Sequence, residues 1–525
     1  MIEWLASRHP GLRAAVAVLA GALAALGFQP YAWWPLVPLG VAGLTVVVLA
    51  ARRVRGAVGL GYAWGIGFLL LGVGWMQVIF PQAMLGLVLV EGAFYAVLGG
   101  ALKLAARTRW WPLLAAACWT SAEFAFSHFP FDGFGWMRLG YAMVDSPLAP
   151  VLPLVGVAGL GFLTALAGQG IAWLAASPSR PRALVAAGVV VAMALLAGGG
   201  ALVPVGVATG STQVGWVQGG APGGGVYGLG APRTITRNHV AEAARLQAAV
   251  ASGQVARPDL VVLPENSTDL DPFRDALTGQ LVRSEVARLG VPTLVGTILD
   301  GPGAEERQTA SLWWDPQHGV VARYIKRGIV PFGEWVPYRS LLLPLIPELA
   351  YVGAQSVPGT VPGALPVTLS DGRDLTLGIL VCYDLVFDHI VYDTVRHGGQ
   401  VLVVQSSNAM YQGTGQIQQQ FAITRARAME LRREVLVVTT SGVSGLVNAD
   451  GSVAFTAPEH VGASGVVAMP ERSGVTPATW LATPLELSIA ALALLGLGAS
   501  LAWGRMGRSA PVLGEEANGR LDSVV

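Results

Sequence analysis

Long apolar stretches, separated by short polar segments, fill the first part of the chain up to about residue 208. Stretches close to 20 apolar residues, the length that crosses a bilayer as a helix, occur seven times there and once more near the end of the sequence. We therefore predict about eight transmembrane helices, over 12–30, 33–51, 57–77, 84–105, 110–127, 148–176, 183–206 and 480–503.

Basic residues cluster in every second loop of these predicted helices. They occur before the first helix and after the second, fourth, sixth and eighth, whereas Arg138 is the only basic residue in the short loops of the other side. Because cytoplasmic loops are enriched in Lys and Arg, we expect both termini in the cytoplasm and residues from about 210 to 475 on the extracytoplasmic face. A cleaved signal peptide in place of the first helix would leave that side unchanged.

The section between the seventh and eighth predicted helices has short apolar runs that are rich in β-branched residues. Such runs are typical of strands buried on both faces, and they lie at 260–264, 293–298, 375–381, 401–404, 435–439 and 465–468. Helical patterns lie between them at 237–250, 273–289 and 416–433. This alternation predicts an α/β layered domain of about 260 residues, enough for one sizeable core.

The pattern divides the chain into four parts. We expect a membrane domain of seven helices at 1–208, an α/β domain at 209–475, the eighth helix at 476–505 and a short cytoplasmic tail at 506–525.

Composition supports a membrane protein and excludes several other classes. Of the 525 residues, 53% are hydrophobic and 12% are charged, about half the charge of soluble domains. The net charge of +1 gives no electrostatic basis for binding nucleic acid. The two cysteines, Cys118 and Cys382, are too few for a disulfide framework, and the seven histidines show no metal-ligand spacing.

Reactive side chains follow the apolar runs of the α/β section. Glu265 follows one run, Lys326 and Glu334 share the segment YIKRGIVPFGEWVP, and Cys382 ends the run LTLGILVC. Layered α/β domains carry their chemistry at strand ends. A nucleophilic cysteine needs a base and a donor for the developing oxyanion, which a carboxylate and an ammonium can supply. Each residue also has a purely structural alternative: Cys382 as a small buried thiol, Glu265 as a carboxylate at a helix N-terminus, and Lys326 as a solvated surface lysine.

These residues, taken in order, resemble the active-site motifs of the carbon–nitrogen hydrolase (nitrilase) superfamily. The flanking apolar stretches and VPFGEWVP narrow the resemblance to the apolipoprotein N-acyltransferase family, over nearly the whole chain from the first predicted helix to the eighth. Further matching segments are WTSAEF (119–124), GFGWMRLGY (133–141), VQGGAP (217–222) and RAMELRREVLVVTTSGVSG (427–445).

The resemblance implies a nitrilase-like α-β-β-α sandwich between the seventh and eighth membrane helices. By similarity, Glu265 is the general base, Cys382 the nucleophile, and Lys326 stabilises the oxyanion with the backbone N–H of Tyr383. Glu334 matches a second glutamate that supports the lysine.

The implied reaction is acyl transfer in two steps through a thioester on Cys382. A phospholipid, typically phosphatidylethanolamine, donates its sn-1 acyl chain, and the α-amino group of a diacylglyceryl-cysteine at a lipoprotein N-terminus accepts it. The resemblance implies a bacterial cytoplasmic (inner) membrane location. We expect no cofactor, no metal and no nucleic acid partner. We expect a monomer.

Several positions depart from the family pattern. Asp384 stands where Glu is usual, Gly220 replaces Asn in the VQGN segment, and Tyr227 occupies the place of a Trp. The usual TND segment is Ser-Asn-Ala here and includes Asn408, and Gln420 stands where many members have His. Tyr227 and Asn408 are weak candidates for contact with the substrate.

Weaker candidates lie in or near the predicted membrane helices. An intramembrane carboxylate is a functional candidate unless it serves only to pair helices. Glu123, in the segment WTSAEF, is such a candidate, and so are Glu91 and Glu486. Trp136 and Tyr141 either contact lipid substrate or belong to an interfacial aromatic belt.

Two other functions compete with acyl transfer. A membrane-tethered amidase or nitrilase acting on a small amide would use the same three residues, but eight helices exceed what a tether needs. A catalytically silent nitrilase-like membrane sensor would not need an intact Glu265, Lys326 and Cys382.

Overall fold

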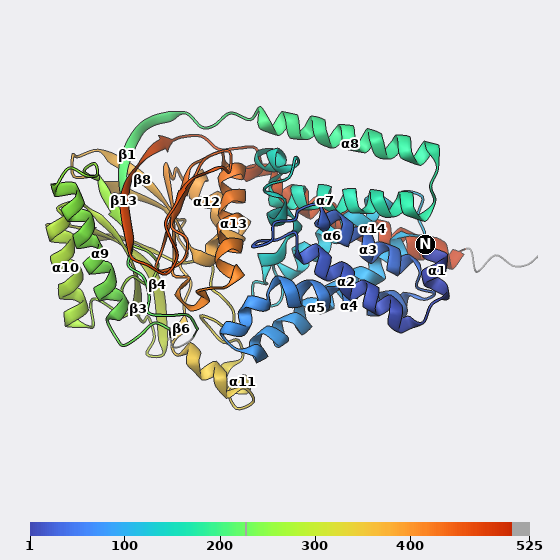
Figure 1. Cartoon of the computed structure of the whole chain (residues 1–525), viewed down its shortest axis with the longest axis horizontal. Helices are drawn as coiled ribbons and strands as arrows, with labels where there is room; N and C mark the ends of the chain where they lie inside the picture. Colours follow the sequence, from blue (N-terminus) through green and yellow to red (C-terminus); the bar gives the residue numbers. More distant parts are fainter. Residues whose placement is uncertain (226–227, 507–525) are drawn as a thin grey trace, which may run out of the picture.

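The computed structural model describes residues 1–225 and 228–506, so Tyr227 and nearly all of the expected tail at 506–525 lie outside the described residues. An apolar helical part and a two-sheet α/β part lie side by side, and the N-terminus is at the far end of the helical part (Figure 1).

The helical part is built from the N-terminal helices and the last one. Five of its helices, among the described residues, are long and apolar enough to cross a membrane. They correspond to five of the eight expected spans: α4 (Val54–Gly72), α5 (Pro81–Ala105), α7 (Leu152–Ala176, preceded by a short 3₁₀ turn), α8 (Arg180–Ala201) and α14 (Ala478–Met506).

The other three expected spans contain shorter helices. These are α2 (Pro10–Ala25), α3 (Leu36–Leu49) and α6 (Trp111–Phe126), with 16, 14 and 16 residues. At 1.5 Å per residue each is about 24 Å or less, against about 30 Å of hydrocarbon. The lengths expected at 12–30 and 33–51 were wrong because the chain leaves the helix after Ala25 and turns through Pro30 and Ala32, whose φ is 58°.

The α/β part contains two mixed sheets. The first has the order β13-β1-β2-β3-β4-β5, with β6 (Gln355–Ser356) on β4, and the second has the order β12-β11-β10-β9-β8-β7. The strands of the first sheet are β1 (Ala208–Gln218), β2 (Leu260–Val262), β3 (Thr293–Asp300), β4 (Glu306–Asp315), β5 (Gly319–Ile325) and β13 (Ala463–Arg472). Those of the second are β7 (Ala364–Thr368), β8 (Asp374–Val381), β9 (Val401–Ser406), β10 (Val435–Thr439), β11 (Gly445–Val447) and β12 (Val453–Thr456).

Alternating residues of the strands fill two different cores. In β2, Leu260 and Val262 pack against the second sheet, whereas Val261 packs against α9 (Thr234–Ala251) and α10 (Ala276–Leu289). The other face of the second sheet is covered by α12 (Asp388–Arg396) and α13 (Gly415–Leu431). The result is the expected α-β-β-α layering, and strands lie at all six predicted runs.

The α12–α13 layer also packs against the helices of the apolar helical part. One continuous apolar cluster contains side chains of α2–α7 and α14 together with Val391 of α12 and Ala426 of α13. Figure 1 shows α13 between the sheets and the helical part. The two parts therefore share a core.

A buried charge network crosses this shared layer. Arg427 of α13 is 0% exposed and donates to Asp388 of α12 at 2.6 Å, to the Tyr141 hydroxyl at 2.9 Å and to Glu430. Arg138, between α6 and α7, donates to Asp388 at 3.1 Å and to Glu486 of α14 at 2.8 Å. A buried charge is tolerated only when paired, so these pairs hold α12, α13 and α14 in one arrangement. Glu486, at least, serves helix pairing.

A break in α7 allows the network to reach that helix. Gly156 has φ of 68° inside α7, and the next backbone N–H, of Val157, donates to Glu430 at 3.0 Å. A Cβ at Gly156 would lie 2.6 Å from Ala482 and 2.8 Å from the Glu430 carboxylate. The position therefore requires glycine for both conformation and space.

Replacing Arg427 by Leu should destabilise the protein by about 3–5 kcal/mol, because it leaves the Glu430 carboxylate buried without its cation and leaves Asp388 with Arg138 alone. The matched control is Arg425→Leu on the same helix, whose partner Asp145 is 42% exposed; it should cost about 1 kcal/mol or less. Thermal unfolding in detergent micelles measures both variants. Equal unfolding temperatures for the two would contradict a structural role for the network.

Candidate active site

Glu265 lies just after β2, at the edge where the two sheets meet. Its carboxylate is 4% exposed, and its Oε2 accepts the backbone N–H of Ser407, just after β9, at 2.9 Å. Its backbone carbonyl accepts the Thr440 hydroxyl at 3.2 Å. Glu265 therefore joins the end of a first-sheet strand to the ends of two second-sheet strands.

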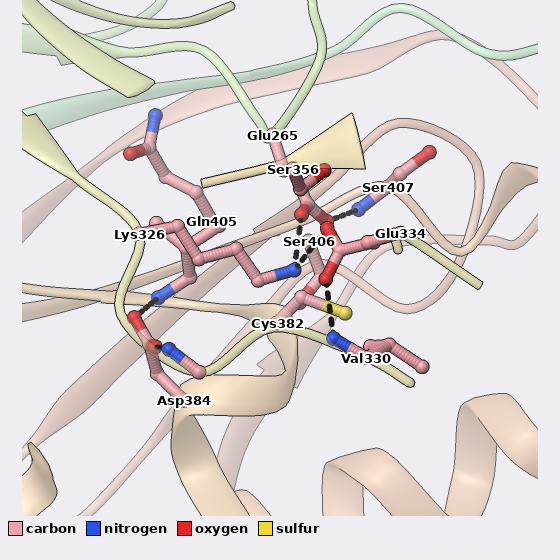
Figure 2. A network of polar contacts seen from close by, with 12 residues as sticks. Glu265, Lys326, Val330, Glu334, Ser356, Cys382, Asp384, Gln405, Ser406 and Ser407 are labelled. Carbon is pink, nitrogen blue, oxygen red and sulfur yellow. Dashed lines mark hydrogen bonds and ion pairs between the residues drawn. The ribbon is translucent and has the colours of Figure 1, made fainter. Parts of the chain in front are cut away.

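Lys326 follows β5 and points into the same space. Its side chain is 1% exposed, and its Nζ lies 3.0 Å from Glu265 Oε1 and 2.8 Å from Glu334 Oε1 (Figure 2). Burial alone would lower the pKa of Lys326, but the charges of Glu265 and Glu334 outweigh it and raise the pKa well above its usual value. The side chain is therefore a cation held between two carboxylates.

Glu334 is held by the loop on which it lies. Its Oε2 accepts the backbone N–H of Val330 at 2.7 Å, and the turn closes with a bond from the Phe332 N–H to the Trp335 carbonyl. Phe332 has φ of 60° in this turn. The carboxylate is thus directed at Lys326 by local backbone geometry.

Cys382 begins the 3₁₀ turn η6 (Cys382–Val386) directly after β8. Its φ of 49° is in the left-handed region, which is uncommon for a residue with a side chain and is found at functional sites. Figure 2 shows the sulfur beside the Glu334 carboxylate and the Lys326 ammonium. The four residues expected to act together are therefore gathered in one site.

The thiol of Cys382 is held in its protonated form. Burial and the charge of Glu265 raise its pKa, and the positive charge of Lys326 offsets only part of that rise. A thiol of this kind does not attack as a resting thiolate, so it needs a base at the moment of reaction.

Asp384, the residue that departs from the usual Glu, is fully buried and has three hydrogen-bond donors. Its carboxylate accepts the Tyr324 hydroxyl at 2.9 Å, the Gly328 N–H at 2.6 Å and the Val381 N–H at 2.9 Å. Tyr324 and Gly328 flank Lys326 in sequence. The shorter acid therefore still ties the lysine segment to the turn that carries Cys382.

Tyr383 connects the site to the apolar helical part. Its ring stacks on Trp136 with centroids 6.2 Å apart, and its hydroxyl donates to the Gly133 carbonyl at 3.3 Å. Trp136 is 4% exposed, and Tyr141 is also buried, so neither belongs to an exposed aromatic belt.

The other two candidates from the sequence, Asn408 and Glu123, are both bonded to other groups of the protein. Asn408, just after β9, donates to Gln416 at 2.9 Å and to Gln420. Glu123 is buried in α6 and accepts the Leu139 N–H at 2.8 Å, so it holds the loop between α6 and α7. Among the described residues, no three His, Cys, Asp or Glu side chains are grouped so as to hold a metal ion.

Two adjacent glutamines of α13 reach the site and its surroundings, and the sequence marked only Gln420, as a departure from the family pattern. Gln420 donates to the Cys382 sulfur at 3.5 Å. Gln419 accepts from the indole N–H groups of Trp75 and Trp136 and donates to the carbonyls of Gln29 and Gly72. The contact of Gln420 with the sulfur and the four bonds of Gln419 are found only once the helix is placed.

Comparison with known proteins identifies two regions. Residues 20–170 match the model of the apolipoprotein N-acyltransferase N-terminal domain, and residues 237–468 match that of carbon-nitrogen hydrolases. The apolipoprotein N-acyltransferase from Mycolicibacterium smegmatis is 31% identical over 83% of this chain and 76% of its own. The one from Bordetella bronchiseptica is 30% identical over 94% of this chain and 97% of its own. One from Haemophilus influenzae is 26% identical over 92% of this chain and 93% of its own.

Similar solved structures cover about half of the chain. An amidase from Nesterenkonia sp. is 21% identical over 52% of this chain and 94% of its own, with a TM-score of 0.35. The C. elegans NitFhit protein is 18% identical over 54% of this chain and 64% of its own, with a TM-score of 0.36.

Alkylation of Cys382 by iodoacetamide should accelerate steadily from about pH 6 to about pH 9. The raised pKa keeps the thiolate fraction small over this range, and each pH unit increases that fraction about tenfold. The rate is measured by mass spectrometry in a Cys118→Ala background. Lys326→Met should slow the reaction at every pH, since it removes the charge that lowers the thiol pKa.

The control is Arg327→Met, which should leave the rate unchanged. The Arg327 guanidinium lies 3.1 Å from the Asp393 carboxylate, with which it pairs, and does not contact the sulfur. A rate that is already constant near neutral pH would show a resting thiolate and contradict this account.

Proposed function

Because the chain belongs to the apolipoprotein N-acyltransferase family, we propose that it moves the sn-1 acyl chain of a membrane phospholipid to the α-amino group of a lipoprotein's N-terminal diacylglyceryl-cysteine. As a family member it is an acyltransferase of lipoprotein maturation. One observation carries the proposed route: the Cys382 thiol lies in the field of the buried Lys326 ammonium and the Glu265 carboxylate.

In the first step, Glu265 takes the thiol proton and the sulfur attacks the ester carbonyl carbon of the phospholipid. The carbon–oxygen bond of the ester breaks, and the glycerol oxygen leaves with the proton returned by Glu265. The products are a thioester on Cys382 and a lysophospholipid. The raised thiol pKa is the reason that a base within the site is needed.

In the second step, the α-amino group of the acceptor attacks the thioester carbonyl. Glu265 accepts a proton from the amine, the carbon–sulfur bond breaks, and the thiol is restored when that proton returns. The product is an N-acylated lipoprotein. Water must be kept from the thioester, because hydrolysis would release the acyl chain as a free fatty acid.

Lys326 stabilises the oxyanion of both tetrahedral intermediates. An ammonium has three N–H donors, and the two carboxylates engage two of them. The third N–H can donate to the substrate oxygen. The backbone N–H of Tyr383 joins it, because the first N–H groups of a helical turn have no partner within the turn.

A lipid donor and a lipid-anchored acceptor are consistent with a catalytic sandwich packed on apolar helices. We extend the proposal to eight crossings by α2–α8 and α14, a membrane domain at 1–208, a catalytic domain at 209–475 on the extracytoplasmic face of a bacterial cytoplasmic membrane, and a cytoplasmic tail after the eighth helix. We also propose phosphatidylethanolamine as donor and a monomeric enzyme.

Incubation with phosphatidylethanolamine and no acceptor should add one fatty-acyl mass to the intact protein and release lysophospholipid. Cys382→Ala should show neither product, and Glu265→Gln should form the adduct far more slowly, because the thiol keeps its proton. A diacylated lipopeptide added afterwards should remove the acyl mass. A folded protein that gives neither adduct nor lysophospholipid refutes the lipid transferase and leaves the small-amide hydrolase or the silent sensor.

Labelling of spheroplasts with a membrane-impermeant maleimide tests the orientation. In a Cys382→Ala background, a cysteine introduced by Ser252→Cys on the surface of the sandwich should react in intact spheroplasts. One introduced by Arg109→Cys, in the loop between α5 and α6, should react only after lysis. The reverse pattern would invert the proposed topology.

A further inference from the structure

The side-chain amide of Gln420 touches the atom that carries the chemistry. Its Nε2 lies 3.5 Å from the Cys382 sulfur, within hydrogen-bonding distance for a sulfur acceptor. In the part of the chain that the structure describes, this is the one hydrogen bond made by that sulfur. Gln420 is itself buried in α13, on the face that looks at β8 and β9.

The surrounding polar groups determine which end of the amide faces the sulfur. The Asn408 side-chain N–H donates to Gln420 Oε1, so the oxygen of Gln420 is directed away from the thiol. The Gln420 nitrogen also donates to the Ser406 hydroxyl at 3.0 Å. An amide flip would turn the oxygen towards the thiol and face two N–H groups against each other at Asn408. The network therefore presents a donor to the sulfur.

The position of Gln420 is set by the residue before it. Gln419 has all its side-chain hydrogen-bonding atoms engaged by the loops and helix ends of the membrane part: two indole N–H groups, from Trp75 and Trp136, and two backbone carbonyls. This contact fixes α13 at the level of the catalytic sulfur. Gln420 therefore comes to Cys382 on a helix that the membrane part holds in place.

We propose that Gln420 is a further catalytic residue, whose amide N–H donates to the Cys382 sulfur and stabilises its negative charge. The role rests on the proposed function for its place in the cycle. The charge forms when Glu265 removes the thiol proton, and it forms again when the sulfur is expelled from the second tetrahedral intermediate. Gln420 gives up no proton in either step; its hydrogen bond strengthens as the acceptor becomes an anion.

Other groups also act on the same sulfur and determine the direction of any change. Glu265, Glu334 and the Tyr411 hydroxyl face it from three different segments, Tyr383 follows it in η6, and Lys326 supplies the positive charge. The carboxylates disfavour the thiolate, and Lys326 favours it. Gln420 adds a neutral donor, so its loss should make the thiolate scarcer without altering the net charge of the site.

Gln420→Leu removes the donor with little change in size. In a Cys118→Ala background, it should slow the alkylation of Cys382 by iodoacetamide about tenfold at neutral pH and move the rate profile to higher pH by about one unit. The matched control is Gln416→Leu, one turn earlier on α13, which also contacts Asn408 and is buried but has no bond to the sulfur. It should leave the profile in place.

Two further variants keep the test decisive. Gln420→Glu retains an oxygen for Asn408 and replaces the donor by a second acceptor, so it should slow alkylation more than Gln420→Leu. Gln420→His supplies an imidazole N–H and should restore part of the rate. An unchanged profile in Gln420→Leu, or an equal shift in Gln416→Leu, would overturn the proposal.

The alkylation assay requires no lipid, so it separates this inference from the proposed function. A shifted profile in Gln420→Leu, with no acyl adduct on the unmodified enzyme, would keep the role at the sulfur and refute the phospholipid donor. An acyl adduct with an unshifted profile would do the opposite.

Discussion

The ammonium of Lys326 has to be buried and charged at the same time, and the site is organised around that requirement. A buried cation is tolerated only with anionic partners at hydrogen-bonding distance. Glu265 and Glu334 supply them from the end of β2 and from the loop after β5, at 3.0 and 2.8 Å. Meeting this requirement brings the edges of both sheets together, because Glu265 also binds the backbone after β9. Cys382 lies in the resulting field, so its thiol is protonated at rest and is activated only by a base beside it.

The second constraint is that the sandwich is held in one position against the apolar helices. The α12–α13 layer faces the sheets on one side and the helices on the other, and the Arg427 and Arg138 ion pairs cross it. Gln419 makes four more polar links across the same layer. For an enzyme whose two substrates are anchored in lipid, the height of the nucleophile above the bilayer decides which ester bond it can reach. A rigid contact between sandwich and helices fixes that height better than a flexible tether would.

The sequence predicts those features that repeat or that match a family motif. Continuous apolar runs locate β2, β8, β9 and β10, whose interior residues are buried on both faces. It does not show β5, whose apolar residues are interrupted by Arg323, or the short α12, because neither has more than three apolar residues in a row. Glu265, Lys326, Glu334 and Cys382 follow from the motifs and do meet in space. The role of Asp384, the network around Arg427 and the contact of Gln420 depend on pairings between distant segments, which no local pattern encodes.

The central claim is that Lys326 and its carboxylates form the site at which Cys382 receives an acyl chain. A structure of the protein trapped with phospholipid and no acceptor tests it most directly. The account predicts a thioester on the Cys382 sulfur, with its carbonyl oxygen about 3 Å from Lys326 Nζ. An acyl group on another side chain, or a thioester oxygen turned away from Lys326, would contradict it.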